Sequence, residues 1–240
     1  MSSLRLFVPA PLSDGIRVPA GAGQAHYLRT VMRRGIGERV LLFNGADGEW
    51  LAELVELARD HAIFAVKERL RQQEPEPDLW LAFGLLKRDA TDLVVQKATE
   101  LGASVIIPVL TERTVATRVN PERLLAIATE AAEQSERLSV PILRNPQRLT
   151  TLLASWPGGR TLIAAVERRH APSVPAGRGP AGLLVGPEGG FAPTELETVL
   201  SHPFVSAASL GPRILRAETA CIVGLGFLSG VGQLQAPAGD

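Results

Sequence analysis

The sequence predicts an α/β protein in which a small β-rich domain precedes a larger domain with a mostly parallel sheet. Short strand-like runs separated by turn residues fill the first part of the chain. A polar stretch broken twice by proline follows at residues 71–78, which is typical of a linker between domains. From residue 79 onward, apolar strands alternate with helical segments. We therefore expect one domain at residues 1–73 and a second at residues 74–240.

The first domain is expected to form a small, partly closed β-barrel. Its strand-like runs are LRLFVP, GIRVP, RVLLFNGADGEWLAELVEL and HAIFAVKERL. The third run contains a hairpin signal, because residues 44–48 tolerate positive φ and lie between two apolar stretches. A helix is expected at residues 24–34, with Tyr27, Leu28, Val31 and Met32 on one face.

The second domain is expected to contain five strands and several helices. A helix at residues 90–102 is closed by Gly102, and another at residues 120–137 has Asn120 as its cap and Pro121 as its first residue. A shorter helix is expected after Thr150. The last helix, residues 217–232, is apolar almost all round, which predicts burial in the core or against another subunit. The expected strands are residues 79–86, 104–111, 161–167, 182–186 and 205–211.

Composition excludes several classes of protein. Of the 240 residues, 25 are basic and 25 are acidic, so bulk charge does not indicate a nucleic-acid partner and any basic surface must be local. The single cysteine, Cys221, excludes an internal disulfide and fits a reducing cytoplasm. The four histidines lie at no spacing typical of metal ligands, so no metal site is expected. We expect no membrane partner, since no signal-peptide pattern and no apolar run of spanning length is found.

Two glycine-rich loops carry the functional signal. VGPEGGF, residues 185–191, and SLGPRILRAETA, residues 209–220, each follow a predicted strand, at the sheet edge where ligands bind in open α/β folds. Such loops leave main-chain N–H and C=O groups free for a ligand such as an adenine ring, beside an apolar wall of Ile214 and Leu215.

Neither common phosphate-binding pattern accounts for these loops. No Gly-Lys-Ser/Thr follows Gly186, so the Walker pattern fails. GLGFLSG, residues 224–230, has one residue too many for the dinucleotide fingerprint and lies in a predicted helix. Its small residues indicate close helix packing instead.

The motifs LLVGPEGGF and LGPRILRAETA, together with KRDATDLVVQKATELGA and PVLTERT, resemble the RsmE family of 16S ribosomal RNA methyltransferases, which belong to the SPOUT superfamily. The resemblance runs through nearly the whole chain and includes HYLRTVMRRGIGERVLLFNG. The chain departs from the family at two positions. It has Ala217 where the family often has Thr, and Ala192 where the family often has a helix-capping Ser.

The resemblance implies both a fold and an activity. The fold is a PUA-like, RNA-binding β-barrel followed by a SPOUT methyltransferase domain that contains a deep trefoil knot, binds the cofactor and dimerises. The activity is the transfer of a methyl group from S-adenosylmethionine to N3 of one uridine in the 16S rRNA of the small ribosomal subunit. The resemblance therefore implies a cytoplasmic homodimer that needs neither a metal nor a membrane.

The expected site residues follow from these loops and from the chemistry. Because uracil N3 carries a proton that must leave, Arg216 or Arg213 would stabilise negative charge on the uracil oxygens, and Glu188 or Glu218 would accept the proton or anchor a loop. The catalytic candidates are thus Arg216, Glu218 and Glu188. The residues expected to bind the cofactor are Leu184, Gly186, Pro187, Glu188, Gly189, Gly190, Leu210, Gly211, Ile214, Leu215 and Ala220.

Local basic clusters supply the expected RNA surface, with a simply solvated helix face as the alternative for each arginine. Two other functions stay open: a binding module that has lost catalysis, and a nucleotide-binding α/β enzyme. The residues alone do not identify the target uridine, the group that accepts the proton, or the effect of Ala217. Nor do they decide between free rRNA and an assembled subunit. The residues expected to face RNA are Arg5, Arg29, Arg33, Arg34, Lys87, Arg88 and Arg113.

Overall fold

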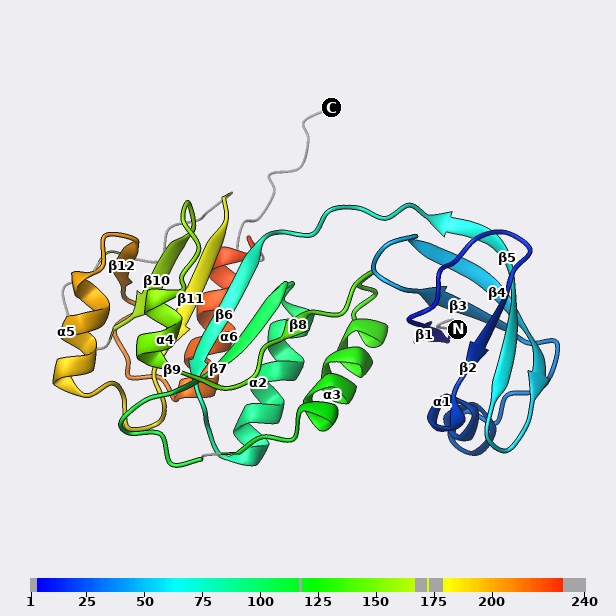
Figure 1. Cartoon of the computed structure of the whole chain (residues 1–240), viewed down its shortest axis with the longest axis horizontal. Helices are drawn as coiled ribbons and strands as arrows, with labels where there is room; N and C mark the ends of the chain where they lie inside the picture. The colour runs from blue at the N-terminus through cyan, green and yellow to red at the C-terminus, as the bar shows by residue number, and fades with distance from the viewer. Residues whose placement is uncertain (1–3, 117, 167–171, 173–178, 231–240) are drawn as a thin grey trace. The chain divides into compact units, whose positions relative to one another are not determined.

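The computed structural model divides the chain into two compact units, each described here by itself (Figure 1). The first unit contains Met1–Pro75 and Ala132–Val140, and the larger unit contains Glu76–Ala131 and Pro141–Asp240. The first unit therefore includes a short segment that the sequence boundary assigned to the second domain. The structure describes all residues except 1–3, 117, 167–171, 173–178 and 231–240.

The first unit is built on a five-stranded sheet with the order β1-β3-β4-β5-β2. Adjacent strands in this sheet pair antiparallel, except that β1 runs parallel to β3. Buried and less buried residues alternate along β4, as expected for a strand with one face on a core. The strands expected in this domain are confirmed. They are β1 (Arg5–Phe7), β2 (Arg17–Ala20), β3 (Arg39–Phe43), β4 (Glu49–Leu57) and β5 (Ala62–Arg71).

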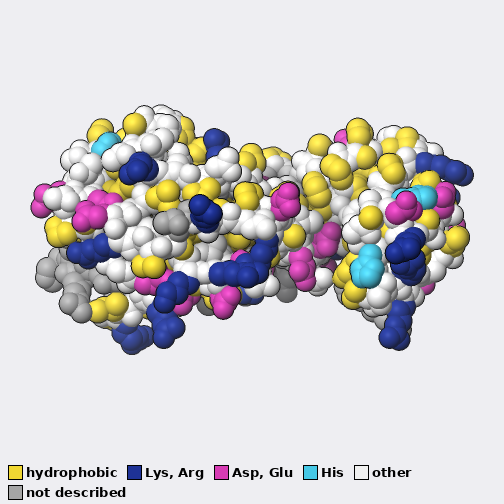
Figure 2. All heavy atoms as spheres, turned by 60° about the horizontal axis from the view of Figure 1, so that its bottom comes forward, with side chains coloured by type: hydrophobic (Ala, Val, Ile, Leu, Met, Phe, Trp, Pro, Cys, Tyr) yellow, Lys and Arg dark blue, Asp and Glu magenta, His cyan; other side chains and the backbone are white. Residues whose placement is uncertain are grey.

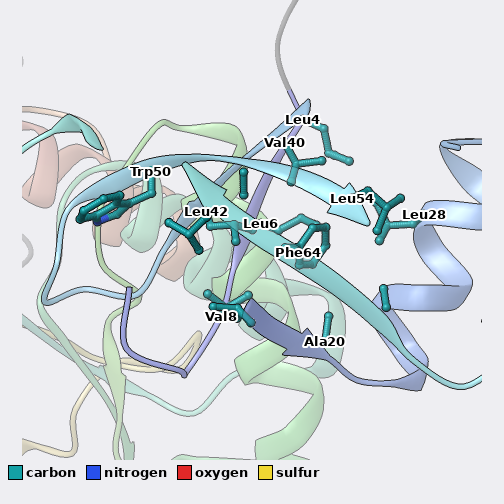
Figure 3. Close-up of a cluster of buried hydrophobic side chains, with 14 of the residues drawn as sticks. Leu4, Leu6, Val8, Ala20, Leu28, Val40, Leu42, Trp50, Leu54 and Phe64 are labelled. Atoms are coloured by element: carbon teal, nitrogen blue, oxygen red, sulfur yellow. The ribbon is translucent and has the colours of Figure 1, made fainter. Parts of the chain in front are cut away.

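A large apolar cluster packs the interior of this unit (Figure 3). Leu6, Leu42, Leu54 and Phe64 come from four different strands and are almost completely buried. Their side chains converge between the strands, and Leu28 closes the cluster from the helical segment. Burial of each such side chain contributes about 1.5–3 kcal/mol relative to leaving it exposed.

The predicted hairpin between β3 and β4 is confirmed, and its turn is ordered by side chains. Asn44 Oδ1 accepts hydrogen bonds from the N–H groups of Ala46 (3.0 Å) and Asp47 (2.8 Å). Gly45 and Gly48 both have positive φ, at 83° and 84°. A Cβ on Gly48 would lie 2.2 Å from the Arg71 carbonyl oxygen, so this position requires glycine for the close approach of β5 as well as for the turn.

The helix expected at residues 24–34 is irregular. It consists of α1 (Ala22–His26) followed by a π-helix, η1 (Tyr27–Val31). A π-helix has more residues per turn than an α-helix, so side chains expected on one face diverge. Leu28 is buried, but Val31 is 60% exposed, so the prediction that Val31 shares one face with Leu28 is wrong.

The larger unit contains a seven-stranded sheet in which every described pair of strands is parallel. The order is β12-β10-β11-β6-β7-β8, and β9 also pairs with β7. The five expected strands are confirmed, whereas β8 and β9, only two residues each, were not predicted. The strands are β6 (Leu79–Gly84), β7 (Val105–Leu110), β8 (Ile142–Leu143), β9 (Gln147–Arg148), β10 (Thr161–Ala165), β11 (Ala181–Val185) and β12 (Val205–Ala208).

The helices of the chain's second part begin and end largely as the sequence indicates. Asn120 caps α3, because its Oδ1 accepts a hydrogen bond from the Arg123 N–H (3.1 Å). Gly102, with φ of 84°, closes α2. Residues 167, 231 and 232 of the expected elements lie outside the described residues. The helices are α2 (Arg88–Glu100), α3 (Pro121–Gln134), α4 (Leu149–Ala154), α5 (Pro193–Ser201) and α6 (Ala217–Leu228).

Helices cover both faces of the larger sheet, with α4 in front and α6 behind in Figure 1. Leu184 of β11 belongs to the apolar cluster that includes α4 and α5. Its neighbour Leu183 points to the other face, where a Cβ on Gly224 of α6 would lie 2.6 Å from Leu183 Cδ2. This contact confirms that glycine in the last helix permits close packing. The deep trefoil knot stays a prediction.

Candidate active site

A large cavity opens at the carboxyl edge of the sheet in the larger unit. Its volume is about 1470 Å³, and both glycine-rich loops line it. The first cradle loop, Gly186–Phe191, follows β11, and the second cradle loop, Ser209–Arg216, follows β12. Because β10 alone separates these parallel strands in the sheet, both loops leave at the same edge.

The first cradle loop is a tight, well-supported turn. The Gly190 N–H donates to the Pro187 carbonyl (2.8 Å), and Gly190 has a φ of 68°, which favours glycine. Pro187 is buried against the end of β6. A Cβ on Gly84 would lie 2.4 Å from the Pro187 nitrogen, so only glycine at position 84 lets the loop approach this closely.

The second cradle loop is more exposed. The Gly211 N–H contacts Ser209 Oγ (3.3 Å), and the Ser209 N–H donates to the Pro172 carbonyl (2.9 Å). No hydrogen bond joins the main chain of Ile214 or Leu215 to another described residue. Ile214 is 56% exposed although it is apolar. The loop thus presents free main-chain groups and an apolar side chain to a ligand.

Charged side chains surround the cavity with an excess of cations. Lys87, Arg88, Arg113, Arg213 and Arg216 line it together with three carboxylates, those of Asp89, Glu188 and Glu218. Figure 2 shows several Lys and Arg side chains close together on the face of the larger unit that holds the carboxyl ends of the strands. A positive rim of this kind attracts a polyanion.

The buried side of α6 is apolar and offers no reactive group to the cavity. Cys221 lies one turn into this helix and is 1% exposed. Burial, and to a lesser extent the negative charge of Glu218, raises the pKa of the Cys221 thiol well above its usual range. The thiol therefore stays protonated and is no nucleophile for the cavity. Among the described residues, no group of three or more acidic, histidine or cysteine side chains is arranged to hold a metal ion.

The structure brings most of the expected cofactor and catalytic residues to this one cavity. The three catalytic candidates, Arg216, Glu218 and Glu188, all line it, as do the loop residues expected to bind the cofactor. Leu184 does not line the cavity. It is fully buried in β11, where it packs in the apolar cluster under α4 and α5.

The residues expected to face RNA divide into two groups. Lys87, Arg88 and Arg113 are exposed at the cavity rim. Arg29 and Arg33 are exposed on the first unit, where Arg33 has a φ of 51° just after η1. Arg34, in the same segment, is partly neutralised by Glu38, whose carboxylate accepts a hydrogen bond from its guanidinium (2.7 Å). That bond holds the pKa of Glu38 below its usual range.

The prediction that Arg5 faces RNA is wrong. Its side chain is 5% exposed and pairs with the buried carboxylate of Glu49 at 2.6 Å. The same guanidinium donates to the carbonyl oxygens of Ala132, Glu133 and Arg137 (3.1, 2.9 and 2.8 Å). Arg5 therefore binds the chain segment that joins the first unit, and its charge is not available to a nucleic acid. An isolated arginine in a strand gives no signal of such a partner more than a hundred residues away.

Two residues that support the cavity were not predicted from the sequence. Gly84 ends β6, and its only signal is a glycine at the end of an apolar strand. Glu195 lies in the first turn of α5, and its carboxylate accepts hydrogen bonds from the N–H groups of Ala192 (3.1 Å) and Glu112 (2.8 Å). The Ala192 contact is half of a capping-box pattern, which a Glu three residues after the cap indicates. The Glu112 contact has no sequence signal.

Both units match known protein families. Residues 72–229 match the family described as the RNA methyltransferase domain, and residues 21–67 match the RNA methyltransferase PUA domain. The chain is therefore an RNA methyltransferase by its domain families. It is 33% identical over 228 residues to ribosomal RNA small subunit methyltransferase E of Rickettsia conorii, a match that covers 92% of this chain and 93% of the relative. The chain belongs to the ribosomal RNA small subunit methyltransferase E family, RsmE, which confirms the resemblance seen in its motifs.

Solved structures agree with this assignment. A putative methyltransferase from Legionella pneumophila, in complex with bound S-adenosylmethionine, superposes with a TM-score of 0.87 at 27% identity, covering 96% of this chain and 98% of the other. A ribosomal RNA small subunit methyltransferase E from Neisseria gonorrhoeae, bound to S-adenosylmethionine, superposes with a TM-score of 0.86, also at 27% identity and the same coverage. No described helix of the present chain is both long and apolar enough to cross a membrane.

Proposed function

We propose that this protein transfers a methyl group from S-adenosylmethionine to N3 of a uridine in the 16S rRNA of the small ribosomal subunit. The observation that carries the proposal is the meeting of the two cradle loops in one cavity, with free main-chain groups on one side and cationic side chains at the rim. The family membership and the cofactor bound by two similar structures support it.

The cavity fits the proposed cofactor in its open space and in its chemistry. A Cβ built on Gly190 or on Gly211 meets no atom within 4 Å, so both loops have room for a ligand beside their main chains. Ile214 and Leu215 offer apolar surface to an adenine ring, and the free N–H and C=O groups can bind its polar edge. When bound, S-adenosylmethionine supplies an already activated methyl group, so the chain's main task is to align the reacting atoms.

The charged residues of the cavity match the remaining chemistry. Loss of the N3 proton leaves negative charge on the uracil oxygens, and Arg216 at the start of α6 is the candidate to stabilise it. Arg213 is the alternative in the same loop. Glu188 lines the cavity from the first cradle loop and Glu218 from the first turn of α6, and either carboxylate can accept the proton or anchor its segment.

The basic residues support an RNA substrate. Since N3 lies on the Watson–Crick edge, the target base must be unpaired when it reaches the cavity. Lys87 and Arg88 at the rim can bind the phosphates around it. Arg29 and Arg33, exposed on the β-rich unit, are candidates for further contacts with RNA and give that unit its proposed RNA-binding role.

We also propose that the protein acts as a cytoplasmic homodimer in which the larger domain, residues 74–240, binds the cofactor and pairs with its copy. The support is an apolar surface on α6, where Phe227 is 48% exposed. Light scattering at micromolar concentration measures the mass of the particle in solution, and we expect the mass of two chains. The mass of a single chain would contradict the homodimer.

Transfer of labelled methyl groups from S-adenosylmethionine tests the activity. We expect incorporation into small ribosomal subunits or their 16S rRNA, with the product mapped to N3 of a single uridine by the stop it causes in reverse transcription. Comparing intact subunits with free 16S rRNA identifies the substrate form. No incorporation by a folded sample that binds S-adenosylmethionine contradicts the proposal, and so does a methyl group on another base.

A further inference from the structure

The turn that follows β7 is locked by its own side chains. The Thr111 N–H donates to Thr114 Oγ1 (2.9 Å), and the Thr114 N–H donates back to the Thr111 carbonyl (3.2 Å). The two residues between them, Glu112 and Arg113, are exposed. Because the turn is closed at both ends, the N–H of Glu112 and the side chain of Arg113 have defined directions.

Arg113 reaches from this turn to the first cradle loop. Its Nη1 donates to the Gly189 carbonyl oxygen (2.9 Å), a hydrogen bond strengthened by the positive charge. The stem of the side chain lies beside the same residue, since a Cβ on Gly189 would be 3.4 Å from Arg113 Cβ. Arg113 therefore supports the loop by packing and by a charged hydrogen bond.

Glu195 ties the same turn to the end of the first cradle loop. Its Oε1 accepts from the Glu112 N–H (2.8 Å), and its Oε2 accepts from the Ala192 N–H (3.1 Å). The carboxylate thus bridges the turn after β7 and the first residue beyond the loop. The chain lacks a capping side chain at Ala192, so this bridge is the side-chain support for the start of α5.

We propose that Arg113 and Glu195 are positioning residues that hold the first cradle loop in the shape that binds the methyl donor. The inference rests on the proposed function, and it gives Arg113 a role other than the RNA contact expected from the sequence. Neither side chain needs to touch the reacting atoms. Both fix main-chain groups before the ligand arrives, and such preorganisation lowers the cost of binding.

Titration calorimetry with S-adenosylmethionine tests the proposal. Arg113→Met keeps the stem and removes the donor, so we expect binding about tenfold weaker, the equivalent of about 1.4 kcal/mol. Arg113→Lys keeps a charged donor and should recover most of that loss. Glu195→Gln leaves one oxygen for two N–H groups, and we expect binding about fivefold weaker, or about 1 kcal/mol. The KM for S-adenosylmethionine should rise in the same order, with kcat changing less.

Matched controls separate positioning from general effects. Arg118→Met removes an exposed cation from the same stretch of chain, and Glu197→Gln removes an exposed carboxylate from α5, so both should bind S-adenosylmethionine like the wild type. For RNA, Arg113→Met should leave the salt dependence of binding to small subunits unchanged. A salt slope lower by about one with normal cofactor affinity would make Arg113 an RNA contact and overturn the proposal.

The outcomes also distinguish this inference from the proposed function. Wild-type protein that does not bind S-adenosylmethionine overturns both. If the wild type binds S-adenosylmethionine, and Arg113→Met and Glu195→Gln both bind it with the wild-type affinity, the positioning role alone is overturned. Arg113→Met leaves the support of α5 intact, so it tests the proposal even where Glu195→Gln lowers the stability of the fold.

Discussion

The two cradle loops line the same cavity, yet they are supported very differently. The first cradle loop follows β11, which lies between β10 and β6. It contacts Gly84 and Arg113, and an internal hydrogen bond from the Gly190 N–H to the Pro187 carbonyl closes its turn. The second follows β12, an edge strand, and leaves Arg213, Ile214 and Arg216 exposed. A loop that follows an interior strand has neighbours on both sides, whereas a loop after an edge strand has support from one side only.

This difference suggests a division of labour within the site. The supported loop provides main-chain groups in a fixed geometry, which suits a cofactor of constant shape. The exposed loop carries the arginines that can face an incoming base and adjust to it. Substitutions in the first loop should therefore lower stability as well as cofactor affinity, whereas substitutions in the second should change cofactor affinity or turnover with little effect on stability.

The largest expected effect lies in the exposed loop. Arg216→Ala should lower kcat about 100-fold, because removal of one donor that stabilises developing charge typically costs 10²–10³ in rate. Cofactor affinity should change less than about twofold, since the loop's main chain is unaltered. Methyl-transfer kinetics and calorimetry on the same sample check this. A larger loss of rate in Arg213→Ala would transfer the role to Arg213.

Gly84→Ala should break the supported loop. The new Cβ would lie 2.4 Å from the Pro187 nitrogen and 2.5 Å from its Cδ, and neither a main-chain atom nor a proline ring can move aside easily. We expect a loss of about 2 kcal/mol in the free energy of unfolding, as in other overpacked sites. Urea unfolding followed by tryptophan fluorescence, to which Trp80 and Trp156 of the larger unit contribute beside Trp50, measures it.

Gly158→Ala is the matched control for this change. A Cβ at position 158 meets nothing within 4 Å, so the free energy of unfolding should change by less than about 0.5 kcal/mol. Equal stability of Gly84→Ala and Gly158→Ala would show that the first loop is not held against β6.

The smallest effects should come from the two glycines with positive φ. Gly190→Ala forces a side chain into a left-handed conformation in a supported loop, and the free energy of unfolding should fall by about 1 kcal/mol. Gly211→Ala, with φ of 115°, places similar strain in the exposed loop, which can relax. We expect a change below about 0.5 kcal/mol in stability there, with weaker cofactor binding instead. If Gly190→Ala and Gly211→Ala lost equal stability, the two loops would be equally well supported, contrary to the comparison.

Much of the fold follows from local patterns. The alternation of apolar strands and helices predicted the parallel sheet, and Asn120 and Gly102 marked helix ends that the structure has at those positions. The two short strands β8 and β9 gave no signal, because two residues carry no periodicity. The π-helix after α1 was missed for a related reason, since an amphipathic pattern does not reveal a widened turn.

The sequence predicted the two loops of the site but not the distant side chains that hold them in place. Glycine and proline mark a loop through their own conformational limits, so VGPEGGF and SLGPRIL stand out in the sequence. Arg5 at the start of β1 and Arg113 just after β7 both look in the sequence like isolated cations of a strand or its end. One is buried against Glu49 and three carbonyl groups, and the other is exposed beside Gly189.

The sequence by itself determined the two-part α/β architecture, the two loops at the sheet edge and, through its motifs, the RsmE family. These properties depend on local periodicity, turn chemistry and short motifs, all of which lie within neighbouring residues. Only the tertiary structure decided which charges are free, which glycines allow close approach and which side chains hold the first cradle loop. Those properties depend on contacts between residues far apart in the chain, such as Gly84 with Pro187 and Glu112 with Glu195, and a linear pattern does not contain that distance information.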